Sequence, residues 1–338
     1  MNVTMQTNAP RTSSGYRLPG LRSMLTLLVL ASASAALANS RVVAWGDVNY
    51  DETIGPSRAI EWVTRIAAGD FHSLALQRNG KVLAWGDNRF GQAAVPTQLR
   101  HKTVVQIAAG NVHSLALECN GRVIAWGTSS GQYGDYGQDN VPPDLRRVVS
   151  VAAGAVHSLA LKRDGTVVAW GYDSCGQCDV PPGLSNVVAV AGGMYHSLAL
   201  RNDGTVVAWG NDDLGQTDVP EGVSNVVAIA AGGFHSLALR NDGTVVSWGH
   251  YGLMNFDVPA GLSNVVAIAT GDYHSLALRN DGTVVAWGQN TSGQCNVPPG
   301  LQNVVAIQAR GNHSMVLLND DPRASFYTRH YHRRGRLW

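Results

Sequence analysis

Histidine followed by serine is the residue pair in this sequence that first raises the question of chemistry, because it recurs seven times. The seven histidines are His72, His113, His157, His196, His235, His274 and His313. Serine beside histidine could act as nucleophile and base, and clustered histidines could hold a metal. A position repeated around an axis keeps its members apart, however, whereas zinc needs three or four ligands at about 2.0 Å. We therefore predict no metal, no cofactor and no catalytic pair, and expect each ring to bond to neighbouring backbone.

Two cysteines form the second candidate, because Cys175 and Cys178 make a Cys-x-x-Cys motif. A second pair at zinc spacing is missing, and so is the strand–helix–strand context of a thioredoxin site. In an oxidising compartment these two residues could form a local disulfide. Cys295 occupies the same place as Cys178 three repeats later, too far away to bridge to it. Neither motif makes the chain an enzyme.

An internal repeat positions these residues. Trp-Gly also occurs seven times, at Trp45, Trp85, Trp126, Trp170, Trp209, Trp248 and Trp287. From each of the first six histidines to the next of these tryptophans is always 13 residues, whereas the return to the next histidine takes 26 to 31. One half of the unit therefore has a fixed length, and insertions fall in the other half.

The fixed half of the unit predicts a β-hairpin. In residues 235–249 two apolar, β-prone runs flank an Asp-Gly turn, and the turn sets the hairpin register. Residues 225–232, rich in Val, Ala and Gly, precede it as a further strand. We place that strand innermost, because small residues suit a crowded axis. Three strands and one long loop in every unit indicate an all-β, seven-bladed β-propeller with three-stranded blades.

The two ends of the repeat array predict how the ring closes. Residues 313–318 form a last middle strand, but Phe326 stands where the next tryptophan is due and Pro322 interrupts the run. Residues 41–46 form an outer strand with no hairpin partner before them. We therefore expect the N-terminal strand to complete the last blade, which removes exposed sheet edges. Each Trp-Gly tryptophan should pack between neighbouring blades.

Composition and charge restrict the partners. The 338 residues are 45% hydrophobic, and only 14% are charged, against about 25% in an average soluble domain. Eight of the 25 Lys and Arg residues lie in residues 1–38 and 322–338, which hold no acid; residues 39–321 therefore carry a net charge of −7. An acidic body is a poor match for phosphates, so no nucleic acid is expected on the propeller. Residues 322–338 are predicted to be a basic, disordered tail.

The N-terminal residues have the features of an export signal. Arg17 and Arg22 precede an apolar run over residues 24–38 that ends in Ala-Leu-Ala. Fifteen residues are too few for a membrane span, which takes about 20, and no other stretch qualifies. We predict a signal peptide over residues 1–38, a propeller over residues 39–321 and a secreted or periplasmic monomer.

The repeat unit resembles the regulator of chromosome condensation repeat. The shared blocks are Trp-Gly-x-Asn-x-x-Gly-Gln, Val-Pro and Val-Val-Ala-Ile-Ala-Ala-Gly-x-x-His-Ser-Leu-Ala-Leu, and they cover about residues 41–318. The short unit, with Val-Pro after Gly-Gln, is most similar to the propeller-type β-lactamase inhibitory proteins (type II) of bacteria. The resemblance implies a seven-bladed fold and a protein-binding role, either inhibition of a secreted enzyme or nucleotide exchange on a small GTPase. An export signal disfavours the second role, and the acidic body disfavours the chromatin binding also known in that family. A carbohydrate-binding or enzymatic propeller stays a third alternative.

Strand direction predicts where a partner binds. The Gly-x-x-His turns and the loops after Trp-Gly should lie on one face, and the hairpin turns on the other. Arg-Asn-Asp-Gly recurs in the hairpin turns, whereas the first face varies between repeats and carries aromatic and acidic residues. The predicted partner-binding residues are Tyr50, Phe71, Phe90, Tyr133, Tyr136, Tyr172, Asp173, Tyr195, Asp212, Asp213, Phe234, Tyr251 and Tyr273. For the four that precede histidine, Phe71, Tyr195, Phe234 and Tyr273, packing against the neighbouring blade is the alternative.

Overall fold

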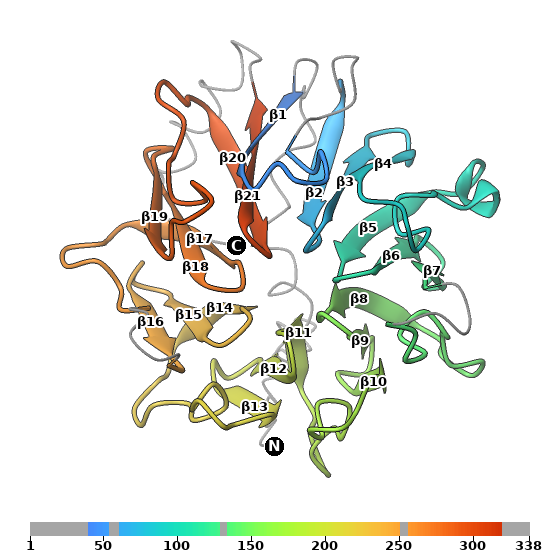
Figure 1. Ribbon diagram of the computed structural model, residues 1–338. Helices are drawn as coiled ribbons and strands as arrows, with labels where there is room; N and C mark the ends of the chain where they lie inside the picture. The colour runs from blue at the N-terminus through green and yellow to red at the C-terminus, as the bar shows by residue number, and fades with distance from the viewer. Residues whose placement is uncertain (1–39, 54–60, 129–133, 251–255, 320–338) are drawn as a thin grey trace, which may run out of the picture.

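The computed structural model describes residues 40–53, 61–128, 134–250 and 256–319. Seven three-stranded antiparallel sheets are arranged in a ring (Figure 1), so the predicted seven-bladed, all-β propeller is confirmed. In the described residues one short 3₁₀ helix, η2 (Thr97–Leu99), interrupts the loops. No helix of these residues is long and apolar enough to span a membrane.

Each blade has an inner, a middle and an outer strand. The inner strands are β2 (Val63–Ala68), β5 (Val104–Ala109), β8 (Val148–Ala153), β11 (Val187–Gly192), β14 (Val226–Ala231), β17 (Val265–Thr270) and β20 (Val304–Arg310). The middle strands are β3 (His72–Gln77), β6 (His113–Glu118), β9 (His157–Lys162), β12 (His196–Arg201), β15 (Ser236–Arg240), β18 (His274–Arg279) and β21 (His313–Asn319). The outer strands are β4 (Val82–Gly86), β7 (Val123–Gly127), β10 (Val167–Gly171), β13 (Val206–Gly210), β16 (Val245–Trp248), β19 (Val284–Gly288) and β1 (Ser40–Gly46). We number the blades 1 to 7 by their inner strands.

The hairpins between middle and outer strands follow from their turn residues. In blade 3 the Gly165 N–H donates to Lys162 O at 2.9 Å, and Gly165 has φ +80°, which glycine adopts without strain. The Asp164 carboxylate accepts from the Thr166 N–H at 3.1 Å. The same backbone turn recurs in blades 4 to 6, which explains why the distance from histidine to tryptophan is constant.

The first strand of the described chain belongs to the last blade. β1 pairs antiparallel with β21, with Ser40 opposite Asn319 and Trp45 opposite Ser314 (Figure 1). Blade 7 therefore takes its outer strand from the other end of the chain, as the sequence predicted. Buried side chains of blade 7, such as Met315 and Leu317, pack with Val63 and Trp85 of blade 1 across this boundary.

The hydrophobic core lies between blades. One cluster joins Leu74 and Leu76 of blade 1 to Val104, Ile107 and Trp126 of blade 2, all nearly inaccessible to solvent. The predicted position of the tryptophans between neighbouring blades is thus confirmed. Such packing holds adjacent sheets as one rigid body, and the loops are mounted on it.

Candidate functional site

The seven histidines form a ring of hydrogen bonds that connects every blade to the next. Each Nε2 lies 2.8–3.2 Å from the serine Oγ of the following blade, from His72 with Ser114 around to His313 with Ser73. The predicted structural role holds, but the partner is a side chain of the next blade and not backbone. Each Nε2 is thus directed at a different serine, and the seven do not converge on one point. Among the described residues no group of three or more His, Cys, Asp and Glu residues is arranged to hold a metal.

The serine hydroxyls do not donate their protons to the histidines, as a nucleophile activated by a base would. In six of the seven, the Oγ–H donates to a loop carbonyl at 2.8–3.0 Å, for example Ser197 to Gln177 O. The histidine must then supply an Nε2–H to the serine oxygen. Burial lowers the pKa of the histidines to about 3, and to about 4 for His313, so the rings are uncharged at neutral pH.

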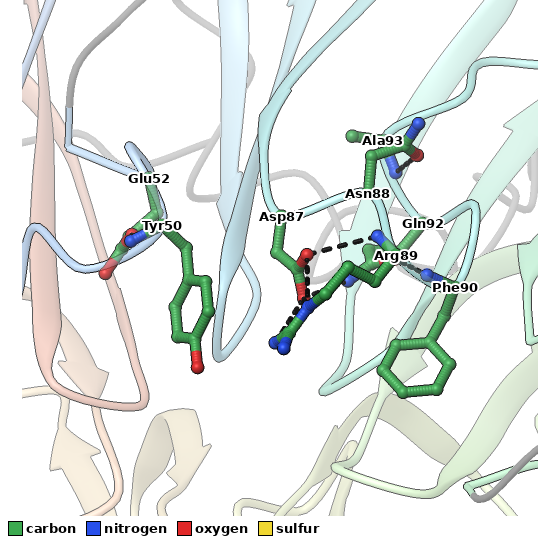
Figure 2. Close-up of polar contacts among 8 residues, drawn as sticks. All are labelled: Tyr50, Glu52, Asp87, Asn88, Arg89, Phe90, Gln92 and Ala93. Atoms are coloured by element: carbon green, nitrogen blue, oxygen red, sulfur yellow. Dashed lines mark hydrogen bonds and ion pairs between the residues drawn. The ribbon is translucent and has the colours of Figure 1, made fainter.

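The loop after Trp-Gly is fixed by one glutamine. The Gln92 carbonyl accepts from Trp126 Nε1 at 2.9 Å. The Gln92 side-chain Oε1 accepts from the Phe90 N–H at 2.9 Å (Figure 2). In the loop that enters blade 1, Glu52 takes this place and accepts from the Tyr50 N–H at 2.9 Å. Burial raises the pKa of Glu52. Gln92 and Glu52 therefore hold the backbone next to Phe90 and Tyr50 in place.

The first aromatic cluster lies at the boundary of blades 7 and 1. Tyr50 and Phe71 meet edge to face, with centroids 5.1 Å apart. The Arg89 guanidinium lies 4.7 Å from the Tyr50 ring centroid and is held by Asp87, with Nε to Oδ1 at 2.9 Å. Figure 2 shows the rings of Tyr50 and Phe90 pointing to the same side of the molecule. The side chains of Tyr50, Phe71 and Phe90 are all half-buried.

Two further aromatic clusters follow around the same face. Tyr172 contacts Tyr136 at 4.5 Å and Tyr195 at 6.0 Å between centroids, which joins the loops of three successive blades. Phe234 stacks on Tyr273 at 5.0 Å. Tyr136 is 42% exposed, and the other four are half-buried. The residues before histidine therefore pack across blade boundaries and also keep part of each ring accessible.

Three predicted acidic residues stand exposed beside these rings. Asp173 accepts from the Cys178 N–H, Asp212 from the Thr217 N–H and Asp213 from the Asn211 amide, at 2.7–2.9 Å. Their carboxylates order the loops, and none of them has an ion-pair partner among the described residues. The predicted residues Tyr133 and Tyr251 lie outside the described part of the chain.

Cys175 and Cys178, which could form a local disulfide in an oxidising compartment, are free thiols in the structure. Cys178 Sγ donates to Tyr172 O at 3.3 Å, whereas Cys175 Sγ lies near Ser174 and Asn211. Cys295 has the same arrangement as Cys178, with its Sγ 3.2 Å from Gln289 O. Burial raises the pKa of Cys178 to about 12, with Asp173 and Asp179 adding to it, and raises that of Cys295 to about 11. These thiols serve as loop hydrogen-bond donors.

Arg310 is the residue that the sequence analysis missed. It stands where the other six repeats have the glycine of Gly-x-x-His. β20 continues through Arg310, which pairs with His313 across a two-residue turn at Gly311, φ +52°. The break in an otherwise constant motif is the signal that could have identified it.

The Arg310 side chain crosses the axis of the ring. Its Nε lies 2.8 Å from Asp70 Oδ1 in blade 1, and Nη1 donates to Gly192 O of blade 4 at 3.0 Å. Asp272 of blade 6 lies near this pair, and burial and Asp70 raise its pKa to about 7 while Arg310 opposes the shift. Blades on opposite sides of the ring are thereby bonded at the end of the axis that carries the aromatic clusters.

A sequence profile described as the RCC1-like domain matches residues 7–317. No curated protein sequence matches.

Three solved structures illustrate the similarity of fold. Prp20p from Saccharomyces cerevisiae is 23% identical with a TM-score of 0.72, covering 88% of this chain and 96% of its own; its structure is described together with its binding to Gsp1p and histones. Human WBSCR16 is 21% identical with a TM-score of 0.65, and the match covers 83% of this chain and 99% of the WBSCR16 chain. The CRINKLY WD40 ectodomain of the Arabidopsis thaliana receptor kinase ACR4 is 19% identical with a TM-score of 0.58, and the match covers 73% of this chain and 90% of the ectodomain chain.

Proposed function

Because the chain belongs to the RCC1-like domain family, we propose that it is a non-catalytic propeller that binds a protein partner. The contact surface is the loop face, which we define by the Gly-x-x-His turns and the loops after Trp-Gly. The seven histidines and the serines that follow them are fully buried, and each histidine Nε2 is bonded to a serine of the next blade. Recognition is therefore left to the loop tips.

One observation supports this proposal above the others: three aromatic clusters with exposed carboxylates on rigid mounts. The best example is Tyr172, whose ring lies between those of Tyr136 and Tyr195, and all three rings remain partly accessible. Partly exposed tyrosines held in place anchor protein interfaces at low entropic cost. Exposed Asp173, Asp212 and Asp213 favour a partner surface that presents basic side chains.

The finer form of the proposal is an exported inhibitor. The basic and apolar residues 17–38 support a secreted or periplasmic monomer. The short repeat unit with Val-Pro after Gly-Gln supports a secreted enzyme as the partner, with β-lactamase as the first example to test.

The second candidate is nucleotide exchange on a small GTPase. It is supported by the likeness in fold to Prp20p, whose described partners are Gsp1p and histones. This role places the protein inside the cell and therefore requires that residues 1–38 are not an export signal.

Two assays on the purified full chain separate these roles. One measures nitrocefin hydrolysis by a β-lactamase, and the other measures release of a fluorescent nucleotide from a Ran-type GTPase. We expect inhibition in the first, with a loss of at least about tenfold for the Tyr136→Ala, Tyr172→Ala double variant. Accelerated release in the second assay would select the GTPase role instead.

A broader test does not depend on the partner's identity. Proteins captured by the chain from its native environment are compared between the wild type, the double tyrosine variant and a control with Arg201→Ala and Arg240→Ala in hairpin turns. Selective loss with the tyrosine variant is expected. Capture of the same proteins by both variants at wild-type levels contradicts the loop face as the contact surface.

A further inference from the structure

The face opposite the loop face is strongly basic over blades 1 to 3. We call it the hairpin face; it carries the middle-to-outer turns and the turns that enter the inner strands. Seven exposed bases on these turns form what we call the basic arc: Arg78, Lys81, Lys102, Arg122, Arg146, Arg147 and Arg163. The same turns expose three acids, Glu61, Asp144 and Asp164, and the last of these pairs with Lys162 at 3.3 Å. No arc residue has an ion-pair partner among the described residues.

Backbone contacts join the turns of the arc within blades 2 and 3 and across the boundary between these two blades. Cys119 N donates to Thr103 O at 2.9 Å, and Val148 N donates to Gly121 O at 3.3 Å. Arg163 N donates to Arg147 O at 2.9 Å. The turns that hold Lys102, Arg122, Arg147 and Arg163 are therefore direct neighbours on one rigid surface.

Blades 4 to 6 lack this excess of positive charge at the equivalent positions. Each of their hairpin turns contains one arginine and one aspartate, for example Arg201 and Asp203, so the turn has no net charge, and the entering turns read Ser-Asn. In blade 3 the asparagine is replaced by Arg147, which adopts φ +58°, a left-handed conformation that asparagine tolerates better than arginine. The basic side chain is present there although the backbone favours another residue.

Exposed apolar side chains also occur at this end of the inner strands, in blades 1, 3, 6 and 7. Of the six large hydrophobic residues that stand exposed among the described residues, four lie there: Trp62 at 43%, Val149 at 37%, Val266 at 43% and Val305 at 39%. Trp62 directly precedes β2, and its carbonyl accepts from the Arg78 N–H at 2.8 Å. Tryptophan beside basic residues is typical of protein surfaces that contact the lipid–water interface.

Both ends of the propeller chain also meet at this face. Ser40 and Asn319 are paired at the hairpin-face ends of β1 and β21. Beyond Asn319 the sequence reads Asp320-Asp321 and then carries five arginines and no acid over residues 322–338, which gives residues 320–338 a net charge of +3. Asn319, the last described residue before this positively charged stretch, therefore lies on the same side of the propeller as the basic arc.

From these observations we propose that the hairpin face docks on an anionic lipid surface, with the basic arc over the headgroups and Trp62 at the interface. Each Lys or Arg near an acidic leaflet adds attraction that salt screens. This orientation points the loop face away from the membrane, so a protein partner and the lipid bind opposite faces. The proposal is independent of the partner's identity.

The experiment is vesicle cosedimentation of the purified full chain. Vesicles of phosphatidylcholine alone are compared with vesicles that also contain phosphatidylglycerol, at low and at high salt. We expect binding to the anionic vesicles alone, lost at high salt. The arc variant Lys102→Glu, Arg122→Glu, Arg163→Glu should bind at least about tenfold more weakly. The matched control Arg201→Glu, Arg240→Glu, Arg279→Glu has the same net charge and chain ends, and should stay within about twofold of the wild type.

Every other outcome overturns the proposal. Equal losses in the two variants would mean that net charge alone drives binding, and equal binding to neutral vesicles would remove the role of the arc. Binding of double-stranded DNA without binding of anionic vesicles would assign the arc to nucleic acid. Circular dichroism checks folding, and Lys81→Glu with Arg146→Glu is a second arc variant. Unchanged partner capture by the arc variants separates this test from that of the loop face.

Discussion

The Nε2 of His313 lies 3.2 Å from the Oγ of Ser73, and this bond joins the last blade to the first. The other six bonds of the ring connect blades that follow one another in sequence, at 2.8–3.0 Å. The boundary where the chain ends meet therefore uses the same contact as every other boundary. Closure depends equally on β1, whose Trp45 Nε1 donates to Gln294 O at 2.9 Å.

Truncating Trp45 tests the contribution of the N-terminal strand. Trp45→Ala removes a buried indole and its hydrogen bond, and we expect it to lower the free energy of unfolding by about 3–5 kcal/mol. Trp209→Ala, at the equivalent position of blade 4, is the matched control and should cost a similar amount. Urea unfolding measures both. A negligible cost for Trp45 alone would mean that β1 does not complete blade 7 in solution.

The buried histidines predict loss of stability in acid. Their pKa values are about 3 to 4 in the folded protein, because burial disfavours the charged ring, and 6.5 in the unfolded chain. The unfolded state therefore binds more protons between these values, so stability falls as the pH drops below 6.5, by up to about 1.4 kcal/mol per unit for each ring. Urea unfolding at several pH values measures this slope. Equal stability at pH 4 and pH 7 would contradict it.

Asp272 predicts a smaller effect of opposite sign. Its pKa is about 7 when folded and 3.8 when unfolded, so the folded state binds the extra proton between these values. Its contribution to stability therefore decreases as the pH rises from 4 to 7. Asp272→Asn removes the cost of ionising this carboxyl. As the pH rises from 4 to 7, the free energy of unfolding of the variant should therefore increase relative to that of the wild type, by up to about 1.4 kcal/mol per pH unit. A difference that is independent of pH would refute the buried, protonated carboxyl.

Arg310 should be among the most costly side chains to remove from the axis. Arg310→Met leaves Asp70 buried without its counter-charge, and breaking a buried ion pair from one side costs about 3–5 kcal/mol. The double variant Arg310→Met, Asp70→Asn should recover a large part of that loss. A double-mutant cycle in urea gives the coupling. Additive costs would mean that the two side chains act independently.

The thiols should differ sharply in reactivity. Cys119 is exposed in a hairpin turn, whereas burial holds Cys178 and Cys295 largely protonated and each donates to a carbonyl. With a thiol-specific chromogenic reagent at pH 8 we expect Cys119 to react first and those two to react slowly. Cys119→Ser should abolish the fastest phase. Fast reaction of Cys178 in the folded protein would show that its loop opens readily.

The fold was predictable because the tryptophan and histidine spacings are locked together. A constant 13 residues between them allows one hairpin register, and seven copies require a closed ring. The position of residues 41–46 followed from counting strands at the two ends. The partner of each histidine did not follow, because it lies on a different blade and depends on the angle between sheets.

The site was predictable as a face, but its internal contacts were not. Alternation of strand direction placed Tyr172 and Tyr195 on the same side, yet only the three-dimensional loop shapes bring their rings together. Cys175 and Cys178 looked like a pair in sequence, but their loop directs the two thiols to different partners. The net charge of −7 over residues 39–321 also averaged two faces of opposite character, so it concealed the basic arc.

The pairing of Ser40 with Asn319 makes the starting point of the chain arbitrary. Because the two residues face each other across adjacent strands, a short linker could join them, and new termini could be opened in any other hairpin turn. A circular permutant cut between Asp203 and Gly204 would keep all seven histidine–serine bonds. The fold depends on the cyclic order of the blades and not on which blade contains the N-terminus.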